Sequence, residues 1–424
     1  MPDGPAEGFP RANPRRNLVT LGLDYALFLV GMSFASQATV LPAFAAHLGA
    51  SNVFIGAIPA VLTLGWFLPS LFTAAHTESL PAKLPFVLRY TVWERVPLVA
   101  LALVAFFLAE RAPALALGVF LALLMLMAGV GGALMPAWMD LVGRAIPTRQ
   151  RGRFFGVANL LASAGGLLGS FLTAYVLATV SAPASYGFCF LAGAVFLGLS
   201  YVSLASTREP PASAPAPAVP LRAYVRGIPG LLRRDANLGS FLIARAFAIG
   251  GAMANGFYTV HALRRYEAAE WQVGVFTTLL MAGQMAGNPV LGWLADRAGH
   301  RLVLVVGVAG LTSANLLALA SRSLDVFSLV FALVGVHLAA INISARTILL
   351  ELSPAVSEHP TYIGLGNTAL APVTFLAPLA AGALADRLGF EAVFAGAAVL
   401  ALIAIGLLLG RVRDPRQSGA TVDA

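Results

Sequence analysis

The sequence predicts an all-α membrane protein with twelve transmembrane helices arranged as two six-helix repeats. Hydrophobic residues make up 58% of the 424-residue chain and charged residues only 11%, whereas soluble domains contain about 25% charged residues. The chain therefore lacks the polar side chains that would cover a soluble surface. Its apolar residues form long runs instead of alternating with polar ones as barrel strands do, which leaves helices as the spanning elements.

Twelve segments are long and apolar enough to cross a hydrocarbon core of about 30 Å, which takes about 20 helical residues. The first is about twice as long as the apolar part of a signal peptide, so we expect it to be retained. In order, the predicted segments are 18–46, 52–74, 84–108, 113–138, 154–179, 186–206, 238–262, 271–294, 301–320, 326–350, 361–384 and 391–410.

Basic residues indicate the orientation. With a cytoplasmic N-terminus, 18 of the 27 lysines and arginines fall in cytoplasmic loops and tails and five in the opposite loops. Because cytoplasmic loops are enriched in Lys and Arg, we expect both termini in the cytoplasm and the chain in the plasma or inner membrane. The net charge of +8 is then a consequence of topology. Since the arginines form no single basic stripe, we expect no nucleic-acid partner.

The longest polar interval divides the chain into two halves. Five prolines between Pro210 and Pro220 predict a semi-rigid linker, and the alternating apolar and basic residues of 221–234 predict a short interfacial helix. The expected organisation is a cytoplasmic tail at 1–17, a six-helix half at 18–206, a cytoplasmic linker at 207–236, a second half at 237–410 and a cytoplasmic tail at 411–424.

The two halves share matching positions. An offset of 220 residues aligns Gly31 with Gly251 and Thr39 with Thr259, which pairs the first segment with the seventh. Offsets of 218 and 208 pair the second segment with the eighth and the fifth with the eleventh. Parallel repeats of six helices are the architecture of one large transporter class, in which the substrate site lies between the halves near the midplane.

The loop after the eighth segment carries the most specific motif. The residues Gly292-Trp-Leu-Ala-Asp296-Arg297-Ala-Gly299-His-Arg301 fit G-x-x-x-D-R-x-G-x-R at every fixed position. With this motif, the number of segments and the repeat, the chain resembles the major facilitator superfamily over residues 18–410. The resemblance implies a secondary transporter whose two halves rock around a central site.

The resemblance also implies cytoplasmic latches. In the second half, Asp296 is expected to face the start of the fifth segment near Phe154, and Arg346 on the tenth segment. The first-half copy is degenerate, with Glu78 and Lys83 in place of the aspartate and the arginine. At the ends of the fourth and tenth segments, two further pairs are assigned to gating: Asp140 with Arg144, and Arg346 with Glu351.

Ionisable residues inside apolar segments are costly and therefore point to function. Asp24 lies roughly 10 Å into the first segment and Arg245 roughly 12 Å into the seventh, at 1.5 Å per residue. The resemblance implies that both segments line the central cavity, so Asp24 and Arg245 are expected to face each other there. They form either a proton and substrate site or a structural pair.

Further candidate residues lie in other segments. Glu94 and Arg95 lie deep in the third segment, and because helix neighbours point about 100° apart, we expect them to have different partners, in a buried network with Asp24 or on the substrate. His337 is a candidate proton switch. The remaining candidate substrate contacts are the amides of Asn255, Gln284 and Asn342.

No motif indicates an enzyme, a metal site or a cofactor. The only lysine, Lys83, is not part of a phosphate-binding loop, so an ion or substrate gradient is the expected energy source. A partial antiporter glycine pattern in the fifth segment favours proton-coupled export of amphipathic molecules, and the absence of a basic residue in the fourth counts against it. The alternatives are uptake of a small polar metabolite, a non-transporting sensor and a lipid flippase. We expect a monomer in the bilayer, with a small molecule and protons as partners.

Overall fold

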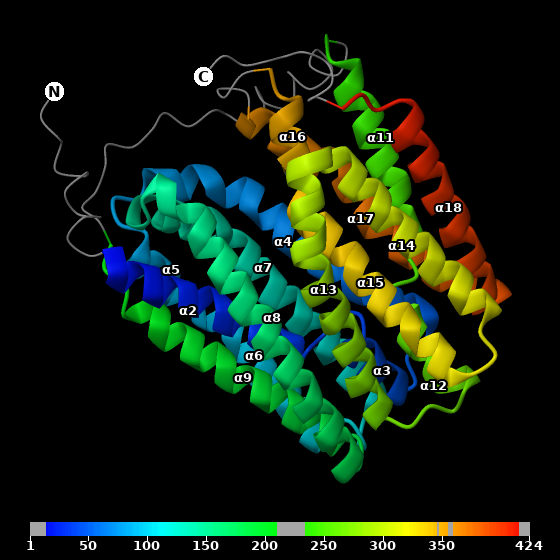
Figure 1. Cartoon of the computed structure of the whole chain (residues 1–424). Helices are drawn as coiled ribbons and strands as arrows, with labels where there is room; N and C mark the ends of the chain where they lie inside the picture. The colour runs from blue at the N-terminus through cyan, green and yellow to red at the C-terminus, as the bar shows by residue number, and fades with distance from the viewer. Residues whose placement is uncertain (1–13, 210–233, 346, 355–358, 415–424) are drawn as a thin grey trace, which may run out of the picture. The chain divides into compact units, whose positions relative to one another are not determined.

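The computed structural model describes residues 14–209, 234–345, 347–354 and 359–414, and all regular structure in these ranges is helical (Figure 1). Nine helices in these ranges are long and apolar enough to cross a membrane. This result confirms a multi-pass membrane protein, while the count of twelve spans and the orientation of the termini stay predictions. The helix expected at 221–234 and most of both tails fall outside the described residues.

The helices follow the predicted segments in order. Those of the first half are α2 (Pro14–Ser33), α3 (Val40–His47), α4 (Asn52–Ser79), α5 (Leu84–Tyr90), α6 (Val92–Leu103), the π-helix η1 (Val104–Leu108), α7 (Pro113–Ala145), α8 (Thr148–Thr179) and α9 (Ala184–Ala205). Those of the second half are α11 (Ala236–Gly251), α12 (Phe257–Arg265), α13 (Trp271–Ala298), α14 (His300–Ala320), α15 (Leu324–Ser344), α16 (Thr347–Leu352), α17 (His359–Leu388) and α18 (Phe390–Gly410).

The first and seventh segments are each broken into two helices. α2 ends at Ser33 and α3 begins at Val40, while α11 ends at Gly251 and α12 begins at Phe257. The second break corresponds to the first at the offset of 220 residues, which supports the internal repeat. Broken helices at matching positions of two repeats mark the neighbourhood of the substrate site in transporters of this architecture.

The described residues divide into two compact units by their contacts. Within the described ranges, unit 1 contains residues 14–36, 47–49 and 61–209, and unit 2 contains residues 37–46, 50–60 and those described between 234 and 414. Two segments of the first half, which include α3 and the first turns of α4, therefore belong to unit 2.

Each unit pairs its helices in the same way. In unit 1, α2 packs on α8 and α9, and α6 packs on α7 and α9. In unit 2, α11 packs on α17 and α18, and α14 packs on α15 and α18. The first helix of each half thus contacts the fifth and the sixth, which is the packing that a duplicated six-helix unit requires.

The α13–α15 contact depends on two glycines. A Cβ at Gly283 would collide with the backbone carbonyl of Ala332, and a Cβ at Gly335 with the carbonyl of Leu280. Small residues allow such close backbone approach, which is a main source of helix association in membranes.

We expect Gly283→Ala to destabilise the protein by about 1–3 kcal/mol, because overpacking a tight contact forces the backbones apart. Gly239 is the matched control, because nothing lies within 4 Å of a Cβ built there and alanine is the better helix former. Thermal unfolding in detergent measures both variants. Equal unfolding temperatures for the two would contradict the prediction.

Candidate functional site

The buried charges of unit 1 gather around Asp24 on α2. Its Oδ1 accepts a hydrogen bond from Ser200 Oγ of α9 (2.7 Å) and lies 3.3 Å from Nη2 of Arg95 on α6. Its Oδ2 accepts a hydrogen bond from the indole Nε1 of Trp138 on α7 (2.9 Å). A single carboxylate therefore connects four helices, and Asp24 is only 3% exposed.

Arg95 supplies the positive charge of this group. Its Nε donates to the Leu197 carbonyl (3.1 Å) and its Nη2 donates to Ser200 Oγ (2.9 Å). The aromatic rings of Phe28 and Tyr201 lie 5.7 and 5.9 Å from the guanidinium carbon, within the range of cation–π attraction. The guanidinium is thus both hydrogen-bonded and flanked by aromatic rings.

Glu94 and Arg95 share a partner, contrary to the expectation of separate ones. Glu94 Oε2 accepts a hydrogen bond from Thr91 Oγ1 (2.8 Å) and lies 3.3 Å from Nη1 of Arg95, which also donates to Thr91. Helical side chains lean toward the N-terminus, so both reach back to Thr91, where α5 gives way to α6. The sequence left two possibilities for Arg95, a buried network with Asp24 or a contact with the substrate. The structure shows the contact with Asp24.

These residues form the Asp24 cluster, which consists of Asp24, Thr91, Glu94, Arg95 and Ser200. With both carboxylates ionised, the cluster carries one more negative than positive charge. Its charged members are between 3% and 9% exposed, and uncompensated charge is expensive at such burial. A proton or a cation would neutralise the surplus, so the cluster is suited to bind one.

Unit 2 contains a buried charge of the opposite sign. Arg245 lies on α11 six residues before the break, and it is 9% exposed. Within the described ranges its guanidinium has neither a hydrogen bond nor an acidic partner. A guanidinium offers five donors in a fork that matches carboxylate and phosphate groups. The site is therefore suited to bind an anion.

His337 lies near Arg245, on α15. Its Nδ1 is 3.0 Å from the carbonyl oxygen of Gly307 on α14, and the side chain is 4% exposed. His337 thus connects α15 to α14, and its predicted role as a proton switch stays a prediction.

The three candidate amides differ in their surroundings. Asn255 lies in the break between α11 and α12, and its Oδ1 is buried without a hydrogen-bond partner in the described part of unit 2. Gln284 is half-buried on α13 and Asn342 is exposed on α15. An unsatisfied buried acceptor is rare in folded proteins, which makes Asn255 the strongest of the three as a substrate contact.

The motif loop of unit 2 joins α13 to α14. Gly299 has φ +84°, a conformation that glycine adopts without strain, and the guanidinium of Arg297 lies 4.5 Å from the centre of the Trp293 ring. Arg301 Nη1 donates to the Val412 carbonyl (2.7 Å). Gly292 and Asp296 lie on the last turns of α13. The expected partner Arg346 falls outside the described residues.

The degenerate first-half loop has a different ion pair. Lys83 is fully buried, with its Nζ 3.5 Å from Asp140 Oδ2, and Arg144 Nη2 lies 2.7 Å from the same carboxylate oxygen. Glu78 lies within α4, but its side chain is not among those described. The pairing of Asp140 with Arg144 is the predicted one, and Lys83 joins it through the same carboxylate.

At the end of the tenth segment, Glu351 lies on α16. Its Oε1 is 3.9 Å from His300 Nε2, and His300 Nδ1 is 3.0 Å from Ser344 Oγ. The histidine comes from the motif loop. Glu351 is therefore linked to the loop that the sequence assigned to gating, through a residue that sequence reasoning did not name.

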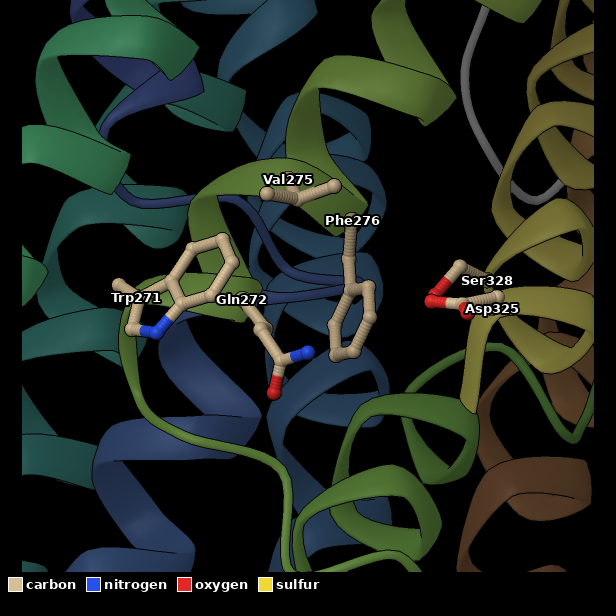
Figure 2. A pocket seen from close by; sticks show the side chains of 6 residues that line it. All are labelled: Trp271, Gln272, Val275, Phe276, Asp325 and Ser328. Atoms are coloured by element: carbon tan, nitrogen blue, oxygen red, sulfur yellow. The ribbon is translucent and has the colours of Figure 1, made fainter. Parts of the chain in front are cut away.

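A surface pocket lies between the first turns of α13 and α15. Figure 2 shows Trp271 and Gln272 on one side and Asp325 and Ser328 on the other, with Val275 and Phe276 between them. Its residues belong to helix ends, while Arg245 lies in the body of α11. We do not assign the substrate to this pocket.

Sequence reasoning missed Thr91 and Ser200, which complete the Asp24 cluster. Hydroxyl side chains are common in membrane helices, where they usually bond the carbonyl one turn earlier, so neither residue differs from its neighbours in the sequence. No group of three or more metal-ligating side chains occurs in the described ranges.

Comparisons with known proteins agree with this architecture. Residues 241–423 match the family model of the Major Facilitator Superfamily. Similar solved structures include the nucleoside transporter NupG (TM-score 0.72, 12% identity, 92% of this chain and 98% of that chain). A POT family transporter in complex with a thioalcohol-conjugated peptide has a TM-score of 0.69 at 13% identity, over 93% of this chain and 95% of that chain.

The D-xylose-proton symporter is also similar, with a TM-score of 0.68 and 12% identity over 94% of this chain and 98% of that chain. At such identities the likeness concerns the fold. Curated proteins gave no match. The second half of the chain thus matches the Major Facilitator Superfamily, and the chain as a whole shares the fold of these solved transporters.

Proposed function

We propose that the chain is a proton-coupled secondary transporter of small molecules that carry a negatively charged group. In this proposal the Asp24 cluster binds the proton and Arg245 binds the substrate anion. The observation that carries the proposal is the pair of buried, opposite charge surpluses, one in each unit. Buried charges without compensation are costly, so binding partners of opposite charge are the simplest reason for a transporter to keep them.

Protonation of Asp24 would act directly on helix packing in unit 1. The neutral carboxyl no longer attracts Arg95, and the ion pair between α2 and α6 weakens. A ligand shifts a conformational equilibrium only through such a difference in interaction between two states. The proposal therefore places the coupling step at the 3.3 Å contact between Asp24 and Arg95.

For the direction of transport we propose export of amphipathic molecules, with uptake of a small polar metabolite as the alternative. Export is supported by the antiporter glycines, because Gly165 and Gly169 of α8 pack against Val30 and Phe34 of the first segment. The proposal includes two six-helix halves, cytoplasmic termini and a monomer in the plasma or inner membrane. Asn255, His337 and Gln284 complete the proposed substrate surface, with Asn342 at its edge.

The test uses purified protein in proteoliposomes with an imposed pH gradient. Small carboxylates, phosphates, neutral compounds and amines are added in turn, and proton flux is recorded for both gradient directions. We expect proton flux with the anionic compounds and little with the amines. Absence of proton flux for every class and both gradient directions would overturn the proposal and favour the sensor or the lipid flippase.

Asp24→Asn is expected to reduce proton-coupled flux by about tenfold or more, because the neutral amide cannot exchange a proton and a charge-assisted contact is lost. Substrate exchange without a pH gradient continues. Asp325→Asn, which removes a carboxylate outside the cluster, serves as the control and leaves both rates unchanged. An Asp24→Asn variant with the parent's pH dependence would contradict the role of Asp24.

A further inference from the structure

The motif of the α13–α14 loop has a second copy in the α17–α18 loop. Gly389 ends the second copy with φ +86°, matching the +84° of Gly299. Three helices that traverse unit 2, α14, α15 and α17, separate the two loops, so they lie at opposite ends of the unit. The residues of the second copy are Gly382-Ala-Leu-Ala-Asp386-Arg387-Leu-Gly389, against Gly292-Trp-Leu-Ala-Asp296-Arg297-Ala-Gly299.

The aspartate of this second copy caps a helix. Oδ1 of Asp386 accepts a hydrogen bond from the backbone N–H of Asn52, and Oδ2 accepts one from the N–H of Val53, each at 3.2 Å. These are the first amides of α4, which have no partner within the helix. A carboxylate at a helix N-terminus also interacts favourably with the helix dipole.

An arginine from α12 binds the same turn. Arg264 Nη1 donates to Asn52 Oδ1 (3.0 Å) and Nη2 donates to the Ala50 carbonyl (3.3 Å). The guanidinium carbon of Arg264 lies 5.9 Å from the centre of the Phe390 ring, on the first turn of α18. The start of α4 is thus held by side chains from two elements of unit 2.

The backbones of α4 and α17 approach closely beneath these polar contacts. A Cβ at Gly382 would collide with the Asn52 carbonyl, and a Cβ at Gly56 would collide with the Pro378 carbonyl. Glycine at both positions is what permits this contact. Gly382 is the first residue of the second motif copy, so one motif provides both the helix cap and the close approach.

The same end of unit 2 holds the α3 segment. Thr39 Oγ1 lies 2.6 Å from Thr277 Oγ1 of α13, and Thr259 Oγ1 of α12 donates to the Ala38 carbonyl (2.8 Å). Thr39 and Thr259 are the pair that the sequence repeat aligns. We name Gln37–Ala46 and Ala50–Ala60 the docked segments, because both belong to unit 2 although the rest of α4 belongs to unit 1.

We propose that Gly382, Asp386 and Arg264 form a latch that holds the docked segments on unit 2, and that the latch opens during each transport cycle. α4 belongs to both units, so any movement of one unit against the other must bend this helix or detach its first turns from α17. The polar contacts lie on exposed side chains of Asp386 and Arg264, which suits an interaction that breaks and re-forms. The proposal does not depend on which substrate or ion is transported.

The test measures access to a thiol beneath the docked segments. Cys189, the only cysteine of the chain, is replaced by serine, and Thr39→Cys introduces a thiol at a position that is 0% exposed. The labelling rate with a membrane-impermeant maleimide is recorded from each side of the membrane. In the Cys189→Ser/Thr39→Cys protein, we expect Asp386→Ala to raise the labelling rate about fivefold. This is the shift in an opening equilibrium that corresponds to the loss of one side-chain helix cap, about 1 kcal/mol.

Related variants define the mechanism. Asp386→Asn, which keeps one acceptor, is expected to give a smaller rise than Asp386→Ala, and Arg264→Gln a rise of its own. Asp325→Ala and Arg265→Gln remove charges from the same end of unit 2 and serve as matched controls that leave labelling unchanged. Gly382→Leu should raise labelling strongly, while Gly406→Leu, where nothing lies within 4 Å of a Cβ, should not.

Unchanged labelling in Asp386→Ala, or an equal rise in Asp325→Ala, would overturn the latch. The Asp386→Ala result decides the matter even where Gly382→Leu fails to fold. The latch and the proposed function fail separately, because labelling requires neither a substrate nor a proton gradient. Conversely, loss of proton coupling in Asp24→Asn has no effect on the labelling that this test measures.

Discussion

The Arg95→Met variant is expected to lose about 3–5 kcal/mol of folding stability, the usual cost of removing one partner from a buried ion pair. Without Arg95, the carboxylates of Asp24 and Glu94 stay buried with no positive charge between them. Ser200 and Thr91 also lose a donor each. Thermal unfolding in detergent, followed by size-exclusion chromatography, measures the effect, and proton-coupled flux should be absent.

A second substitution should reverse most of this loss. In Asp24→Asn/Arg95→Met the leftover charge of Asp24 is gone, and only Glu94 remains ionisable in the cluster. Lowering the pH should also recover part of the stability of Arg95→Met, because the carboxylates then bind protons and their burial costs less. Equal instability of the single and double variants at every pH would show that Arg95 acts through packing alone.

The hydropathy of the sequence predicts where helices lie but not where they break. All twelve predicted segments contain helix, yet the first segment is interrupted between Ser33 and Val40. The interrupting residues include neither glycine nor proline, and Gln37 is the only large polar side chain among them, so a hydropathy average over 20 residues does not detect the break. The position of the first break can be inferred only from the alignment of the two repeats, after the structure has shown the second break at 252–256.

The sequence predicts which charged residues belong to the candidate site, but it does not predict which residues they contact. Asp24, Glu94, Arg95 and Arg245 are conspicuous because ionisable residues are rare in apolar segments. The partners of these residues depend on tertiary packing and on one local feature, the junction of α5 and α6 at Thr91. At this junction the side chains of Glu94 and Arg95 both reach the hydroxyl of Thr91. Helical spacing alone points Glu94 and Arg95 apart, which is why the expectation of separate partners was wrong.

For the latch, the sequence contains the motif but not the partner of its aspartate. Its motif can be read in the sequence, because Gly382, Asp386, Arg387 and Gly389 repeat the spacing of the α13–α14 loop. The copy is shorter than the motif of the α13–α14 loop, because Glu391 stands where that motif has Arg301. What the sequence does not contain is the binding partner of Asp386, since backbone amides at a helix N-terminus have no residue-specific signature.

Arg245→Met is expected to combine a gain in stability with a loss of transport. Replacing buried ion pairs by apolar side chains of similar volume can stabilise proteins by about 1–4 kcal/mol, and a buried charge without a partner should gain at least as much. The same change removes the proposed anion contact, and charge-assisted hydrogen bonds contribute about 1.5–3 kcal/mol each. Transport of an anionic substrate should therefore fall by about 10- to 150-fold, measured as flux into proteoliposomes.

Arg245→Lys and ligand-induced stabilisation provide the controls. Lysine keeps the charge but not the planar fork, so transport should be intermediate and stability unchanged. Small carboxylates or phosphates should raise the unfolding temperature of the parent protein in proportion to the logarithm of their concentration, and they should not do so for Arg245→Met. A destabilised Arg245→Met variant would mean that the guanidinium holds the fold together.

The comparison of the two arginines is more informative than either variant alone. Arg95 and Arg245 have the same exposed fraction, 9% each, and the substitution by methionine is the same. They differ in their surroundings, because Arg95 contacts two carboxylates and Arg245 has no acidic partner in the described ranges. If burial of a guanidinium were the decisive factor, both variants would change stability in the same direction. Opposite signs would show that Arg95 is neutralised by the fold, whereas Arg245 awaits a charge that only a ligand supplies.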